Sequence, residues 1–254
     1  MTRSGHAFAG CAAVLWLACS LGLAQEQEGE ATDEGGVSWG AETDVNSQYV
    51  WRGIIFDKHL VVQPTAWLSA KNLTFSLWNN HVPQAENGFA SGNEFDFELA
   101  YEKNLGAVNM ELSTAYYVYP HQKDSPPTGE AAMKLAVPKG PFELSTTQTF
   151  DVVQYPGAYF GEVQAAVHQD LIRGLNGEIS ASAGWASAKF NETYVGLRRT
   201  ALNFVSGQAA VTFPFTSHVY LKPHAELFHA IDSAVAEATQ REAWNFGGTL
   251  GIEW

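Results

Sequence analysis

The chain is poor in charged residues and in cysteine, and each shortage narrows the class of protein. Only 16% of its residues are Asp, Glu, Lys or Arg, whereas 13% are aromatic. Both cysteines, Cys11 and Cys19, lie near the amino end. If that segment is removed on export, no thiol is left for a disulfide or a cysteine-bound metal. The histidines are scattered without metal-binding spacing, so the sequence predicts no bound metal ion. We also expect no other cofactor.

Basic residues are scarcer than acidic ones. The chain has 14 Lys and Arg against 27 Asp and Glu, a formal net charge of −13. A nucleic-acid-binding protein needs a basic surface to neutralise phosphates, so this class is excluded. Rossmann, P-loop and G-x-S-x-G motifs are also absent, and we predict that the chain is not an enzyme. Ser145, Asp151 and His168 fall on neighbouring predicted strands, which leaves an envelope lipid or peptide hydrolase as an alternative.

Long hydrophobic runs are absent after the amino end. Residues 1–24 have an early Arg3, an apolar run and small residues before Gln25, the pattern of a secretory signal peptide. A lipoprotein signal ending at Cys19 is the alternative, although Trp16 stands where such signals normally have Leu. Residues 25–36 are acidic and lack large apolar side chains, which predicts a flexible periplasmic leader. No later run approaches the roughly 20 residues of a membrane-spanning helix.

Residues 37–254 are dominated by alternation of apolar and polar residues, the period of a β-strand. The clearest case is residues 93–103, where Phe95, Phe97 and Leu99 alternate with acidic residues. Similar segments are bounded by Gly, Pro, Asn and Asp, and we count about twelve, with ten possible. They are residues 37–49, 59–70, 73–78, 93–103, 106–118, 130–137, 142–153, 158–169, 175–187, 202–213, 218–229 and 242–254.

The connections between these segments alternate in length. Short connections such as Lys71-Asn72 and Asn104-Leu105 alternate with long ones such as residues 79–92 and 119–129. Short periplasmic turns with longer outer loops are typical of bacterial outer-membrane barrels. Within lipid a sheet must close on itself, because every backbone polar group has to pair. We therefore predict an all-β, antiparallel up-and-down transmembrane barrel in the bacterial outer membrane, with its apolar face against the lipid bilayer.

The last segment supports the same fold. Residues 242–254 have one apolar face, and the chain ends on Trp254. An alternating strand with a terminal aromatic residue resembles the closing strand of outer-membrane barrels, which the outer-membrane assembly machinery recognises. This resemblance implies the assembly machinery as a partner.

The segment at the end of the first predicted strand carries a second resemblance. It contains Ser47, Tyr49, Arg52, Gly53 and Ile54, followed by Ile55, and Gln63-Pro64 and residues 76–80 come later in the chain. Together these residues resemble the TorF-type putative porin family, whose members read S-x-Y-x-x-R-G-I-S, with Ile55 in place of the final Ser. The resemblance implies a porin-like barrel and does not extend to a substrate.

The polar face of the predicted strands is rich in carboxylates, and Arg52 stands beside it. The lumen and selectivity candidates are Glu42, Asp44, Arg52, Glu94, Asp96, Glu98, Glu111, Lys134, Asp151, Glu162, Lys222 and Glu226. A wet lumen with this excess of acid favours cations. We expect a channel for passive diffusion of small polar solutes or ions, with cations preferred. The alternative is an occluded structural or surface-interaction barrel, in which arginines and lysines pair with the carboxylates and the outer loops bind a partner.

Aromatic residues near the strand ends predict the membrane-interface girdles of such barrels, because their amphipathic rings suit headgroup depth. The candidates are Trp39, Trp51, Tyr116, Tyr159, Trp185, Trp244 and Trp254.

Overall fold

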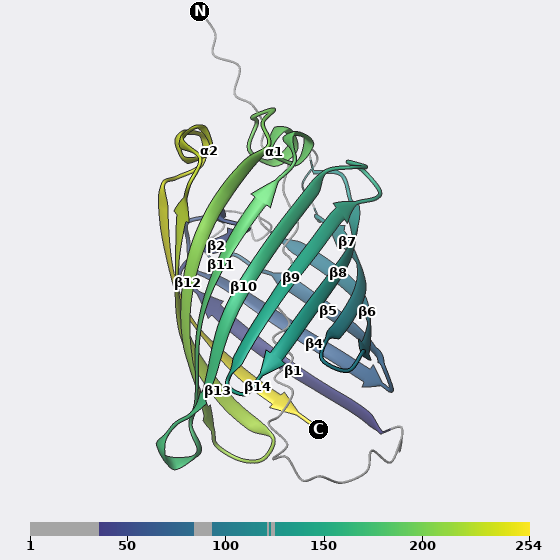
Figure 1. Ribbon diagram of the computed structural model, residues 1–254, viewed down its shortest axis with the longest axis vertical. Helices are drawn as coiled ribbons and strands as arrows, with labels where there is room; N and C mark the ends of the chain where they lie inside the picture. Colours follow the sequence, from purple (N-terminus) through teal and green to yellow (C-terminus); the bar gives the residue numbers. More distant parts are fainter. Residues whose placement is uncertain (1–35, 84–92, 121, 123–124) are drawn as a thin grey trace, which may run out of the picture.

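The computed structural model describes residues 36–254 except 84–92, 121 and 123–124 (Figure 1). The predicted signal peptide and nearly all of the predicted leader lie outside the described residues, so both stay predictions. No helix in the described part of the chain is long and apolar enough to cross a membrane.

The described chain forms a closed antiparallel barrel of twelve strands, which confirms the predicted fold class. The barrel strands are β1 (Val37–Asn46), β4 (Val61–Ala70), β5 (Leu73–Asn80), β6 (Glu94–Asn104), β7 (Asn109–Val118), β8 (Thr128–Lys139), β9 (Phe142–Asp151), β10 (Tyr159–Asp170), β11 (Asn176–Ala186), β12 (Ala201–Pro214), β13 (Val219–Ala230) and β14 (Glu242–Glu253). Each strand pairs with its sequence neighbours in the barrel, and β1 closes the sheet by pairing with both β4 and β14.

The strands place large apolar residues on the outer face and carboxylates on the inner face. Phe97, Leu112 and Phe246 expose 42%, 44% and 56% of their surface. Asp96 and Glu94, which alternate with Phe95 and Phe97 on β6, are buried on the opposite face. Because successive side chains of a strand point to opposite faces, the carboxylates of this strand face the lumen.

The two ends of the barrel differ, as the alternating connection lengths predict. One end, which we call the turn end, carries the short connections, such as those from β4 to β5 and from β8 to β9. The other end, the loop end, carries the long connections together with α1 (Ala188–Tyr194) and α2 (Ser233–Ala238), at the top of Figure 1. A single 3-10 turn, Ile172–Gly174, lies in the β10–β11 connection at the turn end.

The connection from β1 to β4 forms a small hairpin of its own. Its strands are β2 (Tyr49–Trp51) and β3 (Ile54–Asp57), which pair only with each other. The first predicted strand, residues 37–49, therefore ends earlier, at Asn46, and the chain bends at Ser47-Gln48 before β2 begins. We call residues 47–60 the hairpin segment.

The middle of the hairpin segment lies within the buried core of the molecule, whereas Ser47 and residues 58–60 are exposed. Tyr49, Trp51 and Ile54 belong to one apolar cluster with wall residues such as Phe160 on β10 and Phe204 on β12. Trp51 is 3% exposed, so its predicted position in a membrane-interface girdle is wrong. The physical reason is that the chain leaves the wall before Trp51, which turns this ring into the barrel instead of toward lipid.

Candidate channel lumen

The hairpin segment contacts several sides of the barrel wall. The Tyr49 hydroxyl donates a hydrogen bond to Glu94 on β6 over 3.0 Å. A Cβ atom added at Gly53 would lie 2.7 Å from Cδ1 of Phe204 on β12. Because β6 and β12 are separated by several strands in either direction around the barrel, the segment spans the interior near the loop end.

Arg52 makes the central contact of this segment. Its Nη1 and Nη2 atoms donate to Oε1 and Oε2 of Glu130 on β8, at 2.9 and 2.8 Å. The two side chains are only 3% and 4% exposed. The Tyr117 hydroxyl on β7 donates to the same carboxylate over 2.8 Å. Glu130 is thus held by donors from the wall and from the hairpin at once.

Aromatic rings surround the guanidinium. The Arg52 Cζ atom lies 4.3 Å from the ring centre of Trp51, 4.6 Å from Phe160 and 5.4 Å from Phe190 on α1. Burial alone lowers the pKa of Arg52, but the charge and hydrogen bonds of Glu130 outweigh burial and raise the pKa above its ordinary value. Arg52 therefore stays protonated inside the barrel.

The backbone at Arg52-Gly53 is in a conformation that side chains disfavour. Arg52 has φ +49° and Gly53 has φ +76°. A left-handed conformation at a residue with a side chain is uncommon and costs free energy. The ion pair with Glu130 offsets this cost at Arg52. At the following position the cost does not arise, because Gly53 has no Cβ atom.

The predicted lumen residues near the loop end are deeply buried. Glu94, Asp96 and Glu162 lie on the inward faces of β6 and β10, close to the hairpin segment. Toward the turn end, the inward carboxylates Glu98 and Glu111 are partly exposed. The interior is therefore filled with side chains at the loop end and less filled at the turn end.

Another group of predicted lumen residues forms contacts on β1 and β13. Asp44 lies 3.0 Å from Nε2 of His224, and Glu42 accepts a hydrogen bond from the Tyr220 hydroxyl over 2.6 Å. Three further predicted lumen residues lie on the inner faces of their strands. They are Lys134 on β8 and Lys222 and Glu226 on β13. All of these side chains keep partial exposure.

Asp151 is hydrogen-bonded to the backbone of the connection from β9 to β10. Its Oδ2 atom accepts from the Thr128 hydroxyl over 2.5 Å, and its Oδ1 atom accepts from the backbone N–H groups of Val153 and Tyr155. These bonds organise the connection from β9 to β10. This buried carboxylate is satisfied by the protein itself.

The alternative trio for a hydrolase is not assembled. Ser145 pairs with Gln164 in the middle of the β9–β10 ladder, whereas Asp151 and His168 lie at opposite ends of it. The His168 ring instead faces Glu178 on β11, at 3.7 Å. These residues offer no nucleophile with an adjacent base.

Sequence reasoning missed Glu130 and Tyr117. The predicted strand covers residues 130–137, whereas β8 begins two residues earlier, at Thr128. The sequence contains a signal for Glu130. Thr128, Glu130 and Lys134 are all at even positions, so on a strand they lie on the same polar face. Tyr117 is six residues after Glu111 on β7, so it faces the interior as Glu111 does, whereas its neighbour Tyr116 faces outward.

The other girdle candidates lie on the outer face. Trp39, Tyr116, Trp244 and Trp254 are all exposed. The Trp185 indole N–H donates to the Tyr159 hydroxyl over 2.9 Å, which links β11 to β10 on that face. Their place at the membrane interface stays a prediction.

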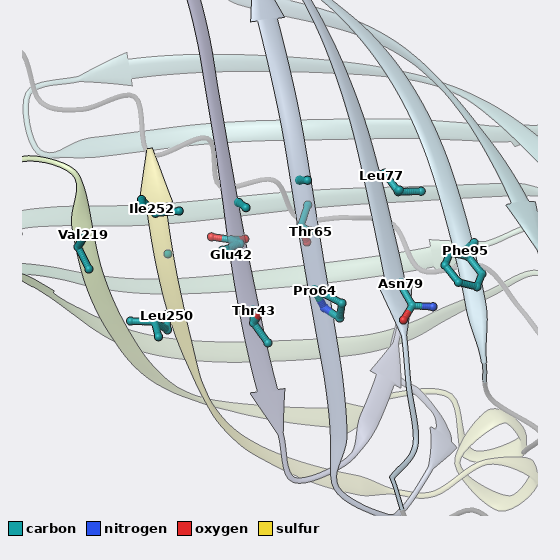
Figure 2. A pocket seen from close by; sticks show the side chains of 13 residues that line it. Glu42, Thr43, Pro64, Thr65, Leu77, Asn79, Phe95, Val219, Leu250 and Ile252 are labelled. Carbon is teal, nitrogen blue, oxygen red and sulfur yellow. The ribbon is translucent and has the colours of Figure 1, made fainter. Parts of the chain in front are cut away.

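A shallow groove of about 660 Å³ lies mostly over β14, β1 and β4 (Figure 2). Its floor is formed by short outward residues, Ala41, Thr43 and Ala66, between the larger Leu77 and Leu250. The groove is therefore a depression of the outer surface and not part of the lumen. Within the described residues, no group of three or more His, Cys, Asp or Glu side chains could hold a metal ion.

The fold is similar to that of solved porins. The chain superposes on a NanC porin with a TM-score of 0.54 and 7% identity, covering 84% of this chain and 98% of that one. It superposes on a KdgM porin with a TM-score of 0.53 and 6% identity, covering 85% of this chain and 98% of that one. These likenesses show the fold, a closed barrel like that of these porins. No protein-family model and no curated relative matches the chain, so the resemblance to TorF-type porins stays a prediction.

Proposed function

We propose that this protein is a bacterial outer-membrane channel that passes small polar solutes or ions by passive diffusion and prefers cations. The observation that carries the proposal is the acidic inward face of a porin-like barrel, with one strand, β6, supplying Glu94, Asp96 and Glu98 in succession. Carboxylates that line a pore raise the local concentration of cations and repel anions.

The balance of inward charge supports the preference for cations. The predicted bases of the inward face are Lys134 and Lys222, while carboxylates stand on β1, β6, β7, β8, β10 and β13. Arg52 adds one positive charge, but Glu130 already neutralises it. The part of the interior that remains accessible is therefore negative.

We further propose that the hairpin segment is the constriction of the channel. Arg52, Trp51 and Tyr49 fill the interior near the loop end, and their contacts reach β6, β8 and β10. A solute that enters from the loop end would have to pass the hairpin segment. Displacement of this segment would open the lumen, so conductance should depend on the Arg52–Glu130 ion pair.

The test is single-channel recording in planar bilayers under a KCl gradient. We expect small or infrequent openings for the natural chain and larger ones when residues 48–58 are replaced by a short Gly-Ser linker. In both cases the reversal potential should show preference for K⁺. Arg198→Ala, in the exposed connection after α1, is the matched control and should behave like the natural chain.

Two results would overturn the proposal. A reversal potential that shows anion preference would refute cation selectivity. Absence of conductance in both the natural chain and the linker variant would favour an occluded barrel that binds a partner through its loops.

A further inference from the structure

The surroundings of Arg52 have the composition of a recognition site for an organic cation. Such sites combine a carboxylate, which accepts two parallel hydrogen bonds from a guanidinium, with aromatic faces that attract the positive charge. Glu130 supplies the carboxylate, and Phe160 and Phe190 supply aromatic faces. We call Glu130, Tyr117, Phe160 and Phe190 the cation cage.

The cation cage is formed by the barrel wall and α1, and not by the hairpin segment. Tyr117, Glu130 and Phe160 lie on β7, β8 and β10, and Phe190 lies on α1. Of the three described rings that lie over the Arg52 guanidinium, one, Trp51, comes from the hairpin segment. If the hairpin moved out, the cation cage would stay in place without its occupant.

Asp96 adds a second buried carboxyl group, to which Arg52 makes no hydrogen bond. It is 1% exposed, and neither of its carboxylate oxygens accepts a hydrogen bond from a basic, amide or hydroxyl group of the described residues. Its side-chain partner is the carboxyl group of Glu94, two residues earlier on the same strand. Strand register places Tyr117 on β7 directly opposite Asp96 on one side and Trp78 on β5 on the other. Two buried carboxyl groups side by side are costly, because like charges repel each other in surroundings of low dielectric. Beside the cation cage there is therefore an acceptor for a second donor group.

We propose that the cation cage and Asp96 form a binding site for soluble organic cations of the guanidinium or alkylammonium type, and that Arg52 is its tethered occupant. A ligand of this class would displace Arg52 from Glu130 and place a further N–H donor against Asp96. The proposal deepens the function proposed above, because it names the class of cation that the channel recognises. Aromatic faces favour an organic cation over a metal ion, and the described residues offer no metal-ligand cluster.

The probe is agmatine, a small dication with a guanidinium at one end and an ammonium at the other. Its binding to the full chain in detergent micelles is followed by tryptophan fluorescence, since Trp51 lies against Arg52. Sodium chloride keeps the ionic strength constant, and butylurea serves as the uncharged probe. We expect saturable binding of agmatine and none of butylurea.

Substitutions separate a recognition site from unspecific attraction. Arg52→Ala removes the tethered competitor, so agmatine should bind about tenfold more tightly or better, because a larger fraction of the protein is then competent to bind. Arg52→Lys keeps a weaker competitor, so its affinity for agmatine should lie between those of the natural chain and Arg52→Ala. It replaces Arg52→Ala in the test if that variant does not fold. Glu130→Gln and Asp96→Asn should each weaken binding about tenfold or more. Glu242→Gln, an exposed carboxylate on β14, should leave affinity unchanged.

Two outcomes would overturn the proposal. If neither Arg52 variant binds agmatine more tightly than the natural chain, Arg52 does not occupy the ligand site. If Asp96→Asn leaves affinity unchanged, the negative charge is neutralised by other means, such as a proton shared with Glu94. Because binding is measured without conductance, cation-selective conductance without agmatine binding refutes only this inference. Agmatine binding without cation-selective conductance refutes only the channel function.

Discussion

Arg52 and Glu130 form a bidentate ion pair across the interior of the barrel, with donor–acceptor distances of 2.9 and 2.8 Å. One partner comes from the connection between β1 and β4, and the other from the wall strand β8. The pair is almost fully buried, so it ties the hairpin segment to the far wall in surroundings of low dielectric.

Removing one partner of this pair should be strongly destabilising. Glu130→Ala leaves the Arg52 charge buried and uncompensated, which typically costs about 3–5 kcal/mol. We expect a loss of this size in urea unfolding of protein folded into lipid vesicles. The exposed pair of Arg198 and Glu192 is the control, and Glu192→Ala should cost less than about 1 kcal/mol. Equal losses in both variants would contradict the role of the buried pair.

The hairpin turn should not tolerate a side chain at Gly53. Gly53→Ala forces a left-handed residue, at about 1–2 kcal/mol, and brings a Cβ atom to 2.7 Å from the Phe204 ring. We expect faster proteolysis within residues 47–60 and more frequent channel openings. Gly106→Ala is the control, because Gly106 has φ +85° and open space around it, so that substitution has the backbone cost alone. It should leave the hairpin segment resistant to proteolysis.

The outward face should reject charge more strongly than the inward face. Leu99→Arg places a charge on the apolar face of β6, which costs about 2–4 kcal/mol at the middle of a bilayer. Thr147→Arg places the same charge inward, opposite Glu162 on β10. Free energies of unfolding from vesicles should therefore fall for Leu99→Arg and change much less for Thr147→Arg. The reverse order would mean that the outer face is not against lipid.

The carboxyl-terminal residue should matter for closing the barrel. Trp254 stacks on Trp39 with ring centres 5.1 Å apart, and the two residues exchange backbone hydrogen bonds of 2.8 and 2.9 Å. Deletion of Trp254 removes these contacts at the seam between β1 and β14. We expect slower folding into vesicles, measured as the fraction that migrates as a compact, heat-sensitive barrel in gels. Deletion of residues 26–30, three of which are Glu, is the control, and this variant should fold at the natural rate.

The wall of the barrel could be predicted from the sequence because strand alternation is a local property. Phe95, Phe97 and Leu99 alternate with carboxylates, and a strand must send such neighbours to opposite faces. The alternating lengths of the connections then indicated closure and the difference between the two ends. These features need no knowledge of which distant residues meet.

The contents of the lumen were decided only by the tertiary structure. Trp51 reads locally as a ring at a strand end, yet the bend after Asn46 turns it inward, where it is 3% exposed. The sequence indicates Arg52 as a candidate, but its partner Glu130 is 78 residues away in the chain and lies across the barrel. Alternation determines the face of a strand that a residue occupies, whereas the path of a connecting segment depends on the ion pairs and rings that it meets after the barrel has closed.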